Sequence, residues 1–232
     1  MKRLLGYFTV WELALWGGSV AATTVAFLLF DDRGYLSLIA SLVGVTALIF
    51  CAKGNPIGQI LIIAFSVLYG VISYGFRYYG EMITYLGMSA PMAVVALISW
   101  LKNPYKGKRS EVKVNRIGRR EVWLMLLLTA AVTLLFYFIL ARLGTASLLP
   151  SALSVATSFL AVYLTFRRSP FYALAYAAND VVLIVLWVIA GTKDPSYISV
   201  IVCFLAFLVN DIYGFTSWIK MQKRQAESAD AA

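Results

Sequence analysis

The chain has 232 residues and a net charge of +9, and it is far more apolar than a soluble protein. Hydrophobic residues make up 61% of it and charged residues only 13%, whereas about a quarter of the residues of a soluble domain are charged. It has no histidine, the usual general base and the commonest zinc ligand. Serine–histidine chemistry and metal-dependent hydrolysis are therefore disfavoured, and we expect no catalytic residues, no metal and no cofactor.

Roughly 20 apolar residues are needed to cross a bilayer as a helix. Pro56 and Pro170 open the third and seventh apolar segments, where a proline costs little. Pro91 lies inside the fourth, where we expect a kink. Cys51 and Cys203 are expected to be small buried side chains. The pattern predicts an all-α polytopic membrane protein with eight transmembrane helices, over residues 11–30, 35–51, 57–77, 82–100, 121–141, 148–166, 170–190 and 196–219.

The charges between these segments predict the orientation. Sixteen Lys and Arg residues fall on one side and four on the other, which places both termini and the 101–120 loop in the cytoplasm. The basic loop is expected to set the topology and to touch anionic lipids of the bilayer, and not to bind nucleic acid. The terminal QAESADAA is expected to be disordered.

Two parts of the chain resemble each other. Pro56 corresponds to Pro170 at a spacing of 114 residues, and Trp100 corresponds to Trp218 at a spacing of 118. The division that follows is an N-terminal extra helix (1–34), a first three-helix repeat (35–100), the basic loop with a linking helix (101–147), a second three-helix repeat (148–219) and a cytoplasmic tail (220–232). One helix between two sets of three makes the repeats parallel, a plan known in transporters, which hold the substrate at the repeat interface.

The stretch YALAYAANDVVLIVLW carries a polar stripe inside an apolar segment. Helical spacing puts Tyr172, Tyr176, Asn179 with Asp180, and Trp187 on one side. An Asp at the centre of a membrane helix costs about 2.5–3.5 kcal/mol, so it indicates a functional site.

A second pair, Asn210 and Asp211, is expected at the same depth on the next helix, about nine residues from its cytoplasmic end. Tyr213 lies beside this pair, and the third helix offers Gln59 and Ser66. Together these residues are predicted to line a central cavity. Two plainer roles stay open: the Asn and Asp side chains can bond helices together, and Trp187 can anchor the helix at the membrane interface.

Such a cavity favours one kind of ligand. Amide and carboxylate groups bond to hydroxyls and carboxamides, and aromatic faces attract flat rings and ring cations. The expected small-molecule ligand is flat, hydroxylated, and neutral or cationic. A phosphorylated ligand fits poorly, because the predicted residues include two aspartates and no positively charged side chain.

The runs RSPFYALAYAANDVVLIVLW, FLVNDIYGFTSWIKM and YGE from Tyr79 to Glu81 resemble the PnuC transporters of bacterial NAD precursors. The resemblance implies a three-plus-one-plus-three core related to SWEET transporters, a multi-pass position in the bacterial inner membrane, and a homotrimer. It also implies facilitated uptake of nicotinamide riboside, which cytoplasmic phosphorylation traps for NAD biosynthesis. The family motif W-x-x-W-x-x-x-N matches at Asn179, but its tryptophan positions hold Tyr172 and Ala175.

Other functions stay open at this point. Relatives of the same architecture carry thiamine, riboflavin or deoxynucleosides, and the departures at Tyr172 and Ala175 bear on that choice. A receptor or membrane subunit without transport of its own is a second class. A membrane-embedded enzyme is disfavoured by the lack of a phosphate-binding glycine motif.

Overall fold

The computed structural model describes residues 6–31, 35–75, 79–145, 147–191 and 197–230. Within these ranges, eight helices are long and apolar enough to cross a membrane. They match the eight predicted segments, and the predicted all-α, polytopic class is confirmed.

The first four crossings come from α2 (Val10–Phe30), α3 (Tyr35–Ala52), α4 (Ile57–Gly75) and a composite of α5 (Tyr79–Ile83), the π-helix η1 (Thr84–Ser89) and α6 (Ala90–Lys102). The composite helix contains Pro91, where we predicted a kink. Just before it, the backbone N–H of Ala90 donates to the carbonyl of Tyr85, a π-helical bond that spans five residues. The helix therefore accommodates its proline by widening one turn.

The remaining crossings are α7 (Arg119–Arg142), α8 (Leu148–Phe166), α9 (Phe171–Gly191) and α10 (Tyr197–Asp230). The basic loop, in which no strand was predicted, contains a hairpin of β1 (Pro104–Tyr105) and β2 (Lys108–Val112). Its turn residues Lys106 and Gly107 both have positive φ, 48° and 75°, as a tight two-residue hairpin turn requires.

The expectation of a disordered tail is wrong for the described residues, because α10 continues to Asp230. The side chain of Gln225 explains this extension. It accepts from the N–H of Val114 at 2.9 Å and donates to the carbonyl of Val112 at 3.0 Å. The end of α10 is thereby bonded to the backbone that leaves the hairpin.

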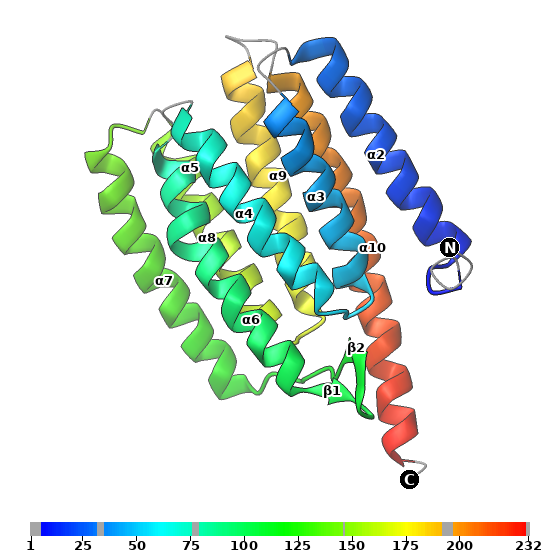
Figure 1. Cartoon of the computed structure of the whole chain (residues 1–232). Coiled ribbons are helices and arrows are strands. Elements are labelled where there is room, and N and C mark those ends of the chain that lie inside the picture. Colours follow the sequence, from blue (N-terminus) through cyan, green and yellow to red (C-terminus); the bar gives the residue numbers. More distant parts are fainter. Residues whose placement is uncertain (1–5, 32–34, 76–78, 146, 192–196, 231–232) are drawn as a thin grey trace.

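Six helices form a closed ring, in the order α3, α4, α6, α8, α9, α10 and back to α3. The other two lie outside it: α2 packs on α3 and α10, and α7 packs on α8. Figure 1 shows α2 and α7 at opposite edges of the molecule, with the hairpin and the C-terminus at one end. We call this end, with the hairpin and the α3–α4 and α8–α9 turns, the hairpin end.

Contacts at the hairpin end join the first three helices of the ring to the last three. The indole N–H of Trp218 donates to the carbonyl of Cys51 at 2.8 Å, and that of Trp100 donates to the carbonyl of Thr165 at 2.9 Å. The two indole rings lie 5.4 Å apart. Both tryptophans are buried, so these bonds tie α10 to the end of α3 and α6 to the end of α8.

The neighbouring serines repeat this arrangement. Ser217 Oγ donates to the carbonyl of Ala52 at 2.8 Å, and Ser99 Oγ donates to the carbonyl of Phe166 at 2.9 Å. Each half of the ring therefore bonds to the other through a Ser-Trp pair near the end of its third helix.

Candidate functional site

A central cavity of about 70 Å³ lies inside the ring and is lined by α3, α4, α8, α9, α10 and the π-helix η1, which precedes α6. Among the described residues, those that line it include two carboxylates and no Lys or Arg. The lining residues are Gly44, Leu48, Cys51, Gln59, Ile62, Phe65, Ser66, Tyr85, Ser89, Ser158, Tyr172, Tyr176, Asn179, Asp180, Phe204, Phe207 and Asp211. Seven of the ten predicted site residues are in this set: Asn179, Asp180, Asp211, Tyr172, Tyr176, Gln59 and Ser66.

The cavity contains two carboxyl groups that face each other, Asp180 on α9 and Asp211 on α10. Asp180 and Asp211 are both buried, and their side chains lie close enough for the two carboxyl groups to share one proton in a hydrogen bond. Asp180 Oδ2 has no hydrogen-bond partner among the described residues. An unpartnered buried carboxyl oxygen is costly, so it is a strong acceptor for a ligand that enters the cavity.

Asn179 is fixed from behind by α8. Its side-chain oxygen accepts from the hydroxyls of Thr157 at 2.8 Å, Ser158 at 3.0 Å and Ser154 at 3.3 Å. These three bonds engage Oδ1 on the α8 side, which leaves the NH₂ group of the amide to offer a ligand.

The hairpin side of the cavity is closed by aromatic and amide groups. The Tyr172 ring packs edge-on against Trp218 at 4.9 Å and against Tyr176 at 6.2 Å. Gln59 donates to the sulfur of Cys51 at 3.5 Å. These side chains lie next to Trp218 and Cys51, whose bond joins the two halves of the ring.

Three predicted residues lie elsewhere. Asn210 turns toward α2, where its amide donates to Ser19 at 2.8 Å. The hydroxyl of Tyr213 donates to Glu12 of α2 at 3.0 Å. Trp187 lines a second cavity toward the opposite end of the molecule. These positions correct the expectation that all ten residues surround one cavity.

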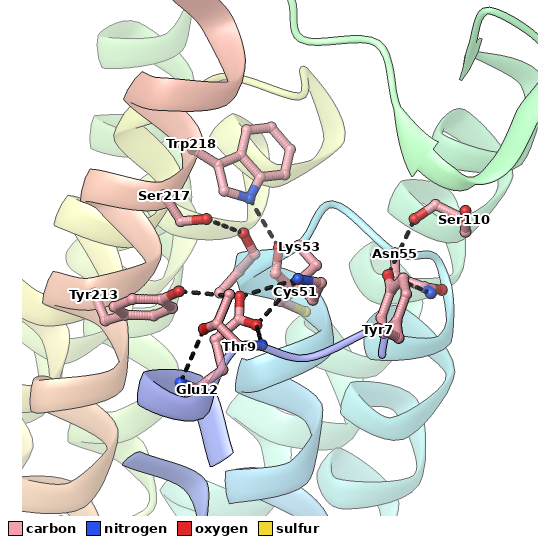
Figure 2. A network of polar contacts seen from close by, with 11 residues as sticks. Tyr7, Thr9, Glu12, Cys51, Lys53, Asn55, Ser110, Tyr213, Ser217 and Trp218 are labelled. Carbon is pink, nitrogen blue, oxygen red and sulfur yellow. Dashed lines mark hydrogen bonds and ion pairs between the residues drawn. The ribbon is translucent and has the colours of Figure 1, made fainter. Parts of the chain in front are cut away.

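Glu12, at the start of α2, is the centre of the polar network in Figure 2. Its carboxylate lies 3.1 Å from Lys53 Nζ, accepts from Tyr213, and accepts from the backbone N–H of Thr9 at 2.6 Å. Glu12 is buried and Lys53 is half-buried, and their ion pair holds the first turn of α2 against the α3–α4 turn, while the bond from Tyr213 holds it against α10.

Tyr7 extends this network to the hairpin. Its hydroxyl accepts from the amide of Asn55 at 3.0 Å and donates to the carbonyl of Ser110 at 3.4 Å. Burial raises the pKa of Tyr7, which keeps the hydroxyl protonated and able to donate.

Several cavity residues were not predicted. Ser158 belongs with Ser154 and Thr157 to a polar face of α8, and their spacing of three and four residues is the signal that could have found it. Phe65 and Phe204 carry no such signal, because phenylalanine in a membrane helix is ordinary. No group of three or more Cys, Asp or Glu residues that could hold a metal ion occurs in the described ranges.

The comparisons with known proteins agree with this architecture. A family model described as nicotinamide mononucleotide transporter matches residues 34–220. A relative from Neisseria mucosa, named nicotinamide riboside transporter PnuC, is 26% identical over 97% of this chain and 87% of its own. A relative of the same name from Haemophilus influenzae is 24% identical over 82% of this chain and 81% of its own.

A solved structure shares the fold. The crystal structure of the vitamin B3 transporter PnuC superposes with a TM-score of 0.81 at 24% identity, over 94% of each chain. Because the family model matches most of the sequence and the structure has eight membrane-length helices, the chain belongs to the nicotinamide mononucleotide transporter family and is a multi-pass membrane transporter, not an enzyme.

Proposed function

We propose that the protein is a facilitative carrier for nicotinamide riboside, the compound named for both relatives. The observation that carries this proposal is the charge of the central cavity, where Asp180 and Asp211 face each other with no positive side chain in the lining. A pyridinium ring with ribose hydroxyls suits this site, since it brings a positive charge and hydrogen-bond donors.

The same charge argues against a phosphorylated ligand. The family description names the mononucleotide, whose phosphate would lie beside two buried carboxyl groups without a compensating cation. We therefore assign the riboside as substrate, and its phosphorylation in the cytoplasm as the step that traps it.

Asn179, Asp180 and Asp211 are the residues proposed to grip the ribose or the carboxamide. Tyr172 and Tyr176 form the wall against which the ring stacks, and Gln59 and Ser66 complete the polar lining. The volume of about 70 Å³ is far below the ~300–1,000 Å³ typical of small-molecule pockets, so the riboside enters only when the helices part.

We propose that the helices part when the two halves of the ring move relative to each other. Residues 35–100 and 148–219 are proposed as two repeats that rock against each other. The paired bonds of Trp100 and Trp218 support the division, because equivalent residues make equivalent contacts. In the structure these bonds close the hairpin end of the ring.

We propose that the hairpin end, with both termini, faces the cytoplasm of a bacterial cell, because most of the Lys and Arg residues between the helices fall on this side. Assembly as a homotrimer in the inner membrane completes the proposal. This follows the resemblance to the PnuC transporters.

Uptake into liposomes that contain only this protein tests the function. Labelled riboside should equilibrate across the membrane without an ion gradient, whereas the mononucleotide should not enter. A receptor would bind the riboside without equilibrating it. A panel of thiamine, riboflavin and deoxynucleosides in the same assay would identify a different substrate.

Substitution of one cavity residue tests the site. Asn179→Ala removes a hydrogen bond worth about 1–2 kcal/mol and should weaken riboside binding about 5–30-fold in the folded protein. Asn115→Ala, in the loop before α7, is the matched control and should bind normally. Wild-type affinity in the Asn179→Ala variant would show that the cavity is not the binding site.

A further inference from the structure

A second cavity of about 60 Å³ lies farther from the hairpin end, and we call it the outer cavity. On each helix that lines both cavities, the outer set lies nearer the end opposite the hairpin. On α4 the lining residues change from Gln59 and Ser66 to Tyr69 and Ser73, and on α9 they change from Asp180 to Trp187. The two cavities therefore stack along the helix axes.

The outer cavity repeats the chemistry of the central one. The rings of Trp187 and Tyr197 lie 5.1 Å apart in its wall, and several Ser and Thr hydroxyls join them. Asp31 is the one charged side chain among the described lining residues. Aromatic faces attract a flat, positively charged ring, and the hydroxyl groups beside them can bond to its substituents.

A layer of phenylalanine rings separates the cavities. Phe65 and Phe204 line both, and Phe207 packs edge-on against each, at 5.6 Å and 5.7 Å. Gly44 makes room for this layer, because a Cβ there would lie 2.5 Å from Phe207 Cζ. We call Phe65, Phe204 and Phe207 the ring layer.

We propose that the outer cavity is a second binding station for the transported aromatic cation, and that the ring layer is the gate between it and the central site. The inference rests on the proposed function, because it takes the same ligand to pass through both cavities. It gives Trp187 a role in transport outside the central site. It also makes α2 part of the wall of the path, through Thr23, Phe27 and the C-cap residue Asp31.

The two cysteines of the chain report on the two cavities. Cys203 lines the outer cavity, Cys51 lines the central one, and both are buried free thiols. Two proteins are needed, Cys51→Ser and Cys203→Ser, each with one thiol. Both are reconstituted and treated from the side opposite the hairpin with a membrane-impermeant methanethiosulfonate that carries a trimethylammonium group, or with its anionic sulfonate counterpart.

We expect the cationic reagent to modify Cys203 at least about fivefold faster than the anionic one, and faster than it modifies Cys51. Nicotinamide riboside should slow modification of both thiols. Trp187→Leu should reduce the protection of Cys203 and leave the protection of Cys51 intact. Trp11→Leu, at an exposed position of α2, is the matched control and should change neither.

The outcomes separate the two proposals. If riboside binds and protects Cys51 but never Cys203, the second station is refuted and the proposed function stands. Equal modification rates at the two thiols would refute the gate, and no modification of Cys203 by either reagent would refute an outer cavity open to that side. If riboside neither binds nor protects either thiol, the proposed function fails and this inference fails with it.

Discussion

The buried tryptophans at the hairpin end should control access to the central cavity from that side. Trp218→Phe keeps an aromatic ring but removes the 2.8 Å bond to the carbonyl of Cys51. That carbonyl keeps a second bond, from the backbone N–H of Gly54 at 2.9 Å, so the variant loses one net hydrogen bond, worth about 0.5–1.5 kcal/mol. This loss destabilises only the closed state, so the population that is open at the hairpin end should rise about 2–10-fold.

Thiol modification measures this shift. In a Cys203→Ser background, a neutral impermeant reagent applied at the hairpin end should modify Cys51 faster by that factor in Trp218→Phe. Trp100→Phe should do the same, although its bond is to Thr165 and not to Cys51 itself. Trp123→Phe, on the exposed face of α7, is the control and should not change the rate.

A folded Trp218→Phe protein that reacts at the rate of Trp123→Phe would refute this reasoning. Acceleration by Trp218→Phe without any effect of Trp100→Phe would mean that the bond protects Cys51 only locally. In that case the paired bonds would not be the closure between the two halves.

Three further substitutions test other features. Gly44→Ala pushes a Cβ to 2.5 Å from Phe207 and should slow riboside uptake at normal expression, as measured by initial rates; an unchanged rate would mean that Phe207 shifts freely. Gln225→Ala removes the bonds between α10 and the hairpin segment and should raise amide exchange at Val114 by about 2–10-fold, as measured by mass spectrometry; equal exchange would leave the ordered tail unexplained. Gly54→Ala forces alanine to φ 65° and should cost about 1–2 kcal/mol of thermal stability; an unchanged unfolding temperature would show that the turn relaxes.

The sequence predicted the helices well because each needs only length and hydrophobicity. The sequence also predicted Asp180 and Asp211 at the same depth on neighbouring helices, and in the structure the two side chains are in contact. Spacing along a helix predicts the direction in which a side chain points. It does not predict which of two cavities, at different depths in the membrane, the side chain reaches. Trp187 is seven residues beyond Asp180, about 10 Å along the axis, and so shares its face while lining a different space.

Adjacent residues on a helix diverge by about 100°, which explains a second error. Asp211 faces the cavity, so Asn210 beside it turns to Ser19 of α2. The hairpin escaped prediction for another reason. Its exposed basic strand lacks the apolar alternation of a half-buried strand, and Lys106-Gly107 was the one local sign of a turn.

The two outer helices, α2 and α7, make equivalent ion pairs, although neither helix belongs to the parts of the sequence that resemble each other. Glu12 at the start of α2 pairs with Lys53, and Glu121 at the start of α7 pairs with Arg167, the residue that corresponds to Lys53. With these outer helices, each proposed three-helix repeat extends to a set of four helices that begins with an acidic first turn. Each ion pair lies within its own half, whereas the reciprocal bonds of Trp100 and Trp218 join the two halves, as in a twofold contact where equivalent surfaces meet. On the proposed division, each half therefore has its own internal ion pair and an equivalent share of the contact between the halves.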